Sequence, residues 1–241
     1  MTTSVKFNGV ELTTDYLCVE VVRPYPTLKL DTVTVPGRDG SILTGAQYSP
    51  IEINMELVAT GGTHATRREL LRSLMSMLNV TEPKPLEFGD DGGKYYMAIP
   101  ANNGKPETWT NADAVQLSFY IPDPVMYSGS ARATAEYDNG KYSILGTYQT
   151  GLYIVATNAQ AGASGYWGLR LDDSDVIKVP MISGTHSVVI DCDARVITVD
   201  DAPVLPTIDS DWFMCEPGAR KIENHLGSNS SLSVAYWPRW L

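Results

Sequence analysis

Two segments of this chain alternate apolar and polar residues so strictly that each suits a β-strand with one buried and one wet face. In residues 51–57 the odd positions hold Ile, Met and Leu, and the even positions hold Glu and Asn. Residues 115–121 repeat the pattern with Val, Leu, Phe and Ile. Successive side chains of a strand point to opposite faces, which gives this period of two. The pattern predicts a mainly β fold in which both strands contribute to a core.

Only one segment has the spacing of a helix. Thr66 followed by Glu69 predicts a capping box at its N-terminus. Arg67 and Arg68 are expected on its solvated face, and Leu70, Leu74 and Leu78 are expected to dock it on the sheet. The sequence therefore predicts one α-helix packed against strands.

The clearest boundary lies in residues 122–130, where Pro-Asp-Pro is followed by Ser-Gly-Ser. Residues 1–127 are predicted to form one β domain and residues 128–241 a second. In the second part, strand-like segments recur about every 8–12 residues between acidic or Gly-rich turns, which is typical of a β-sandwich or jelly roll. A length of 241 residues suits two domains of this kind.

The charge balance excludes several classes of protein. The chain has 28 acidic and 18 basic side chains, a net charge of −10, so a basic groove for sequence-specific nucleic-acid binding is not expected. No apolar stretch is long enough for a membrane span, and no signal peptide is visible.

The three cysteines are far apart and odd in number, which favours free thiols in a reducing compartment.

Motifs that carry chemistry are missing from the sequence. His64, His186 and His225 lie outside any nucleophile or zinc-binding context, and no phosphate-binding loop occurs. The acidic run of residues 172–175 has oxygens for a calcium ion but lacks the spacing of a calcium loop, so an acidic turn is favoured. We predict no catalytic, metal-binding or cofactor-binding residue, and no cofactor.

Aromatic residues on the strands of the second half allow another interpretation. Tyr166 and Trp167 are candidate carbohydrate contacts, because exposed rings stack on sugars. The alternative is that such rings fill the core of the sandwich. A carbohydrate-binding module that attaches to host cell-wall glycans through the second domain is therefore the alternative function, and a hydrolase of wall polymers is a weaker one.

Several short motifs, in order along nearly the whole chain, resemble the distal tail protein (Dit) family of siphophages. A capped helix follows the alternating strand, as in that family. The motifs are Phe7-x-Gly9-Val10-x-Leu12, residues 35–40, the strand of residues 51–57, Asp123-Pro124-x-x-Tyr127, Phe213-x-x-x-Pro217-Gly218 through Ile222, and the segment from Trp237 to Leu241.

The resemblance implies a structural role without catalysis. It implies an N-terminal β-sandwich with one helix and a belt hairpin, and a C-terminal galectin-like β-sandwich. Six copies would form a ring at the distal end of the tail tube, through which DNA passes. The partners would be the tail tube protein, the tail-tip or baseplate hub and, in some relatives, a receptor-binding protein or a host glycan. The location would be the virion tail tip, assembled in the host cytoplasm.

The resemblance also points to one contact between copies. Gly37 and Gly40 bracket Arg38 and Asp39 in a tight turn at the start of a polar excursion. On the residues alone this is an ordinary solvated hairpin tip, but with the resemblance it becomes the expected contact between ring neighbours. The expected oligomer interface is Val35, Pro36, Gly37, Arg38, Asp39 and Gly40. The excess of acidic over basic side chains suits a ring whose channel repels the phosphates of DNA.

Overall fold

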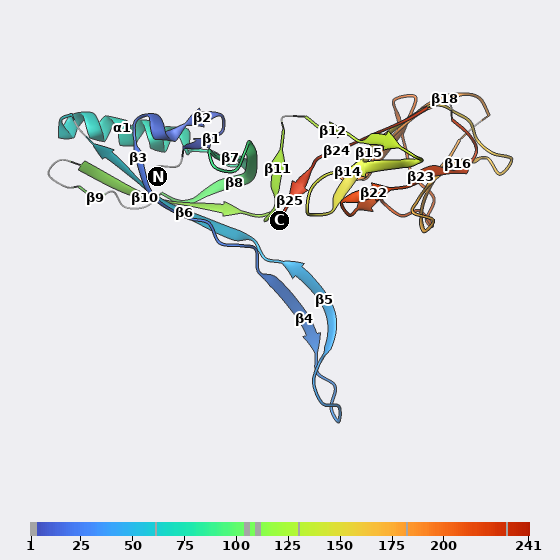
Figure 1. Ribbon diagram of the computed structural model, residues 1–241, viewed down its shortest axis with the longest axis horizontal. Helices are drawn as coiled ribbons and strands as arrows, with labels where there is room; N and C mark the ends of the chain where they lie inside the picture. The colour runs from blue at the N-terminus through green and yellow to red at the C-terminus, as the bar shows by residue number, and fades with distance from the viewer. Residues whose placement is uncertain are drawn as a thin grey trace. The chain divides into compact units, whose positions relative to one another are not determined.

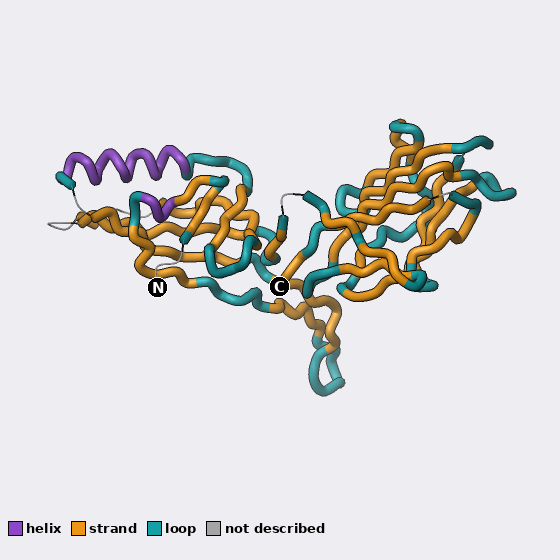
Figure 2. The backbone as a smooth tube through the Cα atoms, turned by 45° about the horizontal axis from the view of Figure 1, so that its top comes forward, coloured by secondary structure: helices purple, strands orange, loops and turns teal. Residues whose placement is uncertain are grey.

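A computed structural model of the chain describes residues 4–60, 62–103, 107–108, 112–129, 131–181, 183–229 and 231–241. Strands predominate, which confirms the predicted mainly β fold (Figures 1 and 2). The chain divides into two units, Met1–Met126 with Leu241, and Tyr127–Trp240; the predicted boundary after residue 127 lies next to this division. In the described part of the chain, no helix is both long and apolar enough to cross a membrane.

The described residues of the first unit form ten strands, one short 3-10 helix and one α-helix. Its elements are β1 (Val5–Phe7), β2 (Val10–Glu11), η1 (Leu12–Thr14), β3 (Leu17–Val22), β4 (Leu28–Val33), β5 (Ile42–Tyr48), β6 (Ile51–Thr60), α1 (His64–Met77), β7 (Lys84–Phe88), β8 (Lys94–Asn103), β9 (Glu107–Thr108) and β10 (Ala112–Ile121).

The two alternating segments of the sequence are antiparallel neighbours in the main sheet of this unit. The strand order is β2-β1-β7-β8-β10-β6-β3, and β10 pairs with β6 from Ala112 opposite Thr60 to Ile121 opposite Ile51. Their apolar residues turn to one side and are buried in a core that includes Phe7, whose ring centroid lies 5.2 Å from that of Phe119. The prediction that both strands share a core is confirmed.

Helix α1 covers the apolar side of the sheet, with Leu71, Leu74 and Leu78 buried and Leu70 partly buried. The helix starts three residues earlier than predicted, so the capping box at Thr66 is wrong. Thr63 is the N-cap, and its hydroxyl accepts the backbone N–H of Thr66 at 3.2 Å. The carboxylate of Glu69 instead pairs with Arg72 on the exposed side of the helix.

The expectation that Arg67 faces solvent is also wrong. Its guanidinium Nε donates to Asp113 Oδ2 at 3.2 Å, and both side chains are buried. Arg67 lies one turn before Leu71 and two turns before Leu74, so the helical period places all three on the same buried face. Arg68, by contrast, is exposed as expected.

The strands β4 and β5 form a separate two-stranded ribbon that projects from the sheet of the first unit (Figure 1). Six paired positions run from Leu28 opposite Tyr48 to Val33 opposite Ile42, with a bulge next to Asp31. Every side chain of β4 is exposed. The ribbon therefore lacks the buried side that β6 and β10 of the main sheet have, and an isolated two-stranded hairpin is only marginally stable in water.

The described residues of the second unit form strands and no helix. They are β11 (Met126–Ser128, starting at the division), β12 (Ala133–Thr134), β13 (Glu136–Asp138), β14 (Lys141–Ile144), β15 (Thr150–Ala159), β16 (Tyr166–Leu171), β17 (Asp175–Pro180), β18 (His186–Asp191), β19 (Val196–Val199), β20 (Ala202–Val204), β21 (Met214–Cys215), β22 (Gly218–Arg220), β23 (Ile222–Leu226), β24 (Ser231–Tyr236) and β25 (Arg239–Trp240).

One core fills the second unit. A large sheet of order β12-β24-β15-β18-β19-β20, with β21 added to β15, accompanies two three-stranded sheets, β13-β14-β22 and β17-β16-β23. Trp167, Phe213 and Tyr236 are the largest fully buried side chains of this core. Gly146 has a positive φ of 126°, and a Cβ there would lie 2.4 Å from the backbone oxygen of Arg239, so only glycine lets β25 approach.

Candidate functional site: an acidic sheet face and an exposed ribbon

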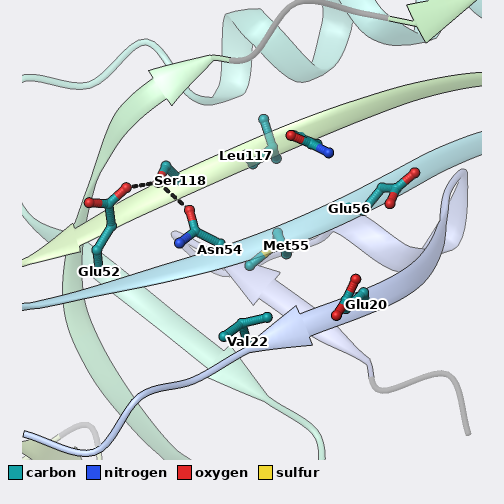
Figure 3. Close-up of a pocket in the computed structure, with 9 residues that line it drawn as sticks. Glu20, Val22, Glu52, Asn54, Met55, Glu56, Leu117 and Ser118 are labelled. Carbon is teal, nitrogen blue, oxygen red and sulfur yellow. Dashed lines mark hydrogen bonds between the residues drawn. The ribbon is translucent and has the colours of Figure 1, made fainter.

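The face of the main sheet that lacks the core is polar and carries a shallow pocket (Figure 3). The pocket has a volume of about 300 Å³, and strands β3, β6 and β10 supply its lining. The hydroxyl of Ser118 hydrogen-bonds the carboxylate of Glu52 and lies 2.5 Å from the amide oxygen of Asn54. The lining residues are Glu20, Val22, Glu52, Asn54, Met55, Glu56, Gln116, Leu117 and Ser118.

Three carboxylates give this face a negative charge. Glu20 comes from β3, and Glu52 and Glu56 come from β6, while no lysine, arginine or histidine is among the described residues lining the pocket. Within the described ranges, no group of three or more His, Cys, Asp or Glu side chains is placed to hold a metal ion. Carboxylates gathered in this way repel anions. We refer to Glu20, Glu52 and Glu56 with their pocket as the acidic face.

The predicted interface residues 35–40 form the exposed tip of the ribbon between β4 and β5. The backbone N–H of Arg38 donates to the carbonyl of Val35 at 3.2 Å. Gly37 and Gly40 both have positive φ angles, of 81° and 79°, in the region that favours glycine. The turn is therefore built as the glycines indicate, and its role as an interface stays a prediction.

Sequence reasoning missed a larger feature of the ribbon, its apolar face. The register places Leu28 opposite Tyr48, Leu30 opposite Ala46 and, beyond the bulge, Thr32 opposite Leu43, and these pairs lie on one face because alternate residues of a strand share a face. Leu28, Leu30 and Leu43 are all exposed. The signal that could have found this face is the alternation of Leu28 and Leu30 with Lys29 and Asp31.

The two candidate carbohydrate contacts are neighbours in β16 and point to opposite sides. Trp167 is 0% exposed and belongs to the core of the second unit. Its predicted role as a carbohydrate contact is wrong, because a ring enclosed by the sandwich offers no face to a sugar. Tyr166 is 37% exposed, and a sugar contact by this single ring stays a prediction.

The three histidines lie in separate places, each beside a charged group. His186 Nδ1 is 2.6 Å from Asp200 Oδ2, and this hydrogen bond lowers the pKa of Asp200. His64 opens α1 and lies 3.6 Å from Asp113. His225 Nδ1 lies 2.6 Å from a guanidinium nitrogen of Arg170. The structure brings no histidine together with a nucleophile in the described contacts.

The acidic turn at residues 172–175 is engaged by cations of the chain. Asp172 accepts the backbone N–H of Lys221 at 2.8 Å and lies 3.1 Å from Arg220. Asp173 lies 3.6 Å from the ammonium group of Lys221. Arg220 also donates to the carbonyl of Glu216 at 2.8 Å. These contacts fasten the turn between β16 and β17 to the strands near its base.

Two family models match this chain, and together they cover most of it. Residues 6–121 match the phage tail protein RIFT-related domain. Residues 145–240 match the C-terminal domain of the siphovirus-type tail component. The search of curated proteins finds no match.

Solved structures share the fold over the full length. The crystal structure of the Dit protein of phage SPP1, described as a paradigm of the hub adsorption apparatus in phages that infect Gram-positive bacteria, matches with a TM-score of 0.81 at 18% identity, covering 100% of both chains. A chain of the phage P2 baseplate in its activated conformation with Ca matches with a TM-score of 0.52 at 11% identity, covering 99% of this chain and 98% of that one. The order of the two matched domains and the shared fold lead to one assignment: this chain belongs to the distal tail protein family of siphophages.

Proposed function

We propose that this tail structural component is a ring adaptor at the distal end of the tail tube. Six copies close head to tail, with the tube protein docked on one side of the ring and the tail-tip hub on the other. The observation that carries the proposal is the apolar face of the β4–β5 ribbon, exposed within this chain. The proposed role involves no catalytic step, and the tail tip is the location that follows from it.

The ribbon needs a surface to cover it. A leucine side chain contributes about 1.5–3 kcal/mol when it is fully buried, and Leu28, Leu30 and Leu43 lie on one face without such burial. A two-stranded ribbon gains little stability by itself. The neighbouring copy of the chain supplies the missing cover in this proposal.

Contact through a projecting ribbon is heterologous, because the ribbon of one copy meets a different surface of the next. A heterologous contact gives a ring when its rotation closes. The turn residues 35–40 then lie at the far end of the contact, where Arg38 and Asp39 offer one charge of each sign. The predicted interface becomes the tip of a longer one whose apolar part lies along β4 and β5.

The acidic face is the proposed wall of the channel. It is the side of the β3-β6-β10 sheet that faces away from the core, and it presents three carboxylates without a cation among its described lining. A negative wall repels the phosphates of DNA, so that DNA slides through without binding. The net charge of −10 is consistent with this role.

Solution mass tests the ring. Light scattering after size exclusion is expected to give about six times 26.3 kDa, with ring-shaped particles in negative stain. The variant Leu30→Asp is expected to give a folded monomer, because a charge replaces the apolar contact. A wild-type chain that stays monomeric at high concentration, together with tail tips without six-fold density, would rule the ring out. No second function is proposed, since burial of Trp167 removes the ring that best suited a sugar.

A further inference from the structure

A short segment of the second unit, residues 205–212, carries two apolar side chains that are almost fully exposed to solvent. The segment leaves β20 after Val204 and enters the core again at Phe213. Leu205 is 84% exposed and Ile208 is 105% exposed. Single exposed apolar residues are ordinary on protein surfaces. Exposure alone therefore does not identify a binding site, and the hydrogen bonds and charges of the segment must be considered.

The segment is held firmly against the edge strand β17. The backbone N–H of Thr207 donates to the carbonyl of Lys178 at 3.0 Å, and that of Asp211 donates to the carbonyl of Val176 at 2.8 Å. The hydroxyl of Ser210 accepts the backbone N–H of Lys178 at 3.0 Å. These bonds fix the segment between Leu205 and Ile208 and again beyond Ile208, and on the other side of Leu205 the chain is held by the pairing of Val204 with Ile197.

Ile208 lies at the corner of a closed turn. The backbone N–H of Ser210 donates to the carbonyl of Thr207 at 3.1 Å, which makes Ile208 and Asp209 the two central residues. Such corners favour Pro, Asp, Asn, Ser and Gly, so the turn itself does not call for isoleucine. A side chain presented on a fixed backbone loses little conformational freedom when it docks, which suits an anchor residue.

The charge around the pair selects the kind of partner. Residues 200–212 contain four aspartates and no lysine or arginine. Asp209 is paired with Lys178, and Asp211 is exposed. A second copy of this chain, itself at −10, is a poor electrostatic match for this surface. A surface with an apolar pocket and lysine or arginine around it matches both features.

We propose that Leu205 and Ile208 form a fixed apolar peg, with aspartates on both sides of it in the chain, that inserts into a basic-rimmed apolar pocket of a different tail protein. The docking surface lies in the second unit, whereas the proposed ring contact lies on the ribbon of the first. The docking proposal therefore does not depend on the ring proposal, and an experiment can contradict either one without the other.

The test uses the full-length chain, immobilised, and each tail-tip protein of the same virion purified as a separate probe. One probe is expected to bind, and the double variant Leu205→Ser/Ile208→Ser is expected to weaken that binding at least tenfold. Leu145→Ser is the matched control, because Leu145 is an exposed leucine of the same unit outside the segment. Raising the salt concentration is expected to weaken wild-type binding, because the rim contributes through charge.

A photo-crosslinking residue at position 208 identifies the contact on the bound probe. Crosslinked peptides rich in apolar and basic residues are expected. Binding that the double variant leaves unchanged, crosslinks only to a second copy of this chain, or no binding by any tail-tip probe would each overturn the proposal. Unchanged melting temperature and ring mass in the double variant separate this result from misfolding and from failure of the ring.

Discussion

Arg67 on α1 and Asp113 on β10 form an ion pair that is closed to solvent. Arg67 Nε lies 3.2 Å from Asp113 Oδ2, and the two side chains are 5% and 0% exposed. Arg67 also donates from Nη1 to the carbonyl of Gly62 at 3.3 Å. The pair fastens the first turns of the helix to the sheet, beside the leucines that pack below it.

Removing one partner of this pair is expected to destabilise the first unit strongly. Arg67→Ala leaves the carboxylate of Asp113 buried without its cation, which lowers the free energy of unfolding by about 3–5 kcal/mol. The control Arg68→Ala removes an exposed arginine of the same helix and changes it by about 0.5 kcal/mol or less. Urea denaturation followed by circular dichroism measures both, and equal effects of the two variants would contradict the prediction.

The two faces of the ribbon are expected to differ in their effect on assembly. Leu30→Asp lies on the apolar face and is expected to abolish the ring, whereas Lys29→Ala on the other face leaves it intact. Neither side chain is buried, so the melting temperature of the monomer stays the same in both. Light scattering and thermal unfolding report the two properties, and loss of the ring in both variants would count against an interface on one face.

Charge reversal on the acidic face is expected to slow genome ejection. Phage carrying Glu52→Lys/Glu56→Lys would present ammonium groups to passing DNA, and these bind phosphates. Phage carrying Glu69→Lys change an exposed carboxylate on the helix instead. Dye-based ejection kinetics in vitro compare the two, and wild-type rates in the double variant would show that this face does not line the channel.

The Lys178–Asp209 pair beneath the peg is expected to survive in acid. Hydrogen bonds from Lys178 and then Thr207 lower the pKa of Asp209 to about 2. Because the folded-state pKa is depressed, the pair contributes fully above the ordinary pKa of about 4, and its contribution is lost as the pH falls through about 2. Carboxyl ¹³C titration of Asp209 measures this pKa. Lys178→Met is expected to raise it toward the ordinary value, and no rise would disprove the role of the ion pair.

The cysteines are expected to be inert in the folded protein. Burial raises the pKa of both Cys192 and Cys215 to about 12, and it also raises the pKa of Cys18. The thiolate is the reactive form, so a thiol reagent at pH 8 labels the chain only after denaturant unfolds it. Rapid labelling of the native protein would contradict this prediction.

The sequence predicted the parts of the fold that repeat a simple period. Burial on one side makes apolar residues recur with the period of the strand or helix. This period identified the strands at residues 51–57 and 115–121 and the apolar face of α1. The same alternation places Glu52 and Glu56 on the wet face. That Glu20 joins them depends on β3 lying beside β6, and no local pattern contains this pairing.

Features that depend on distant partners were not predictable. Arg67 can be buried because it pairs with Asp113, which lies 46 residues further along the chain. Residue type alone predicts that an arginine is exposed to solvent. The strand β5 has no apolar alternation of its own, and the register shift next to Asp31 that places Leu43 opposite Thr32 cannot be read from the sequence. Tyr166 and Trp167 could not be separated without knowing which side of β16 faces the core.

The position of β24 in the large sheet affects how late in translation the second unit can be completed. This strand lies between β12 and β15, and the hydroxyls of Thr157 and Ser231 are 2.6 Å apart although 74 residues separate them in the chain. At ~5–20 residues per second, a ribosome needs about 4–15 s between those two residues. During that interval β15 has been made but β24, its neighbour on one side, has not, while β1 to β10 of the first unit are already complete. Translation that stops before codon 231 would release a chain that has strands β1 to β10 of the first unit but a second unit that lacks an inner strand.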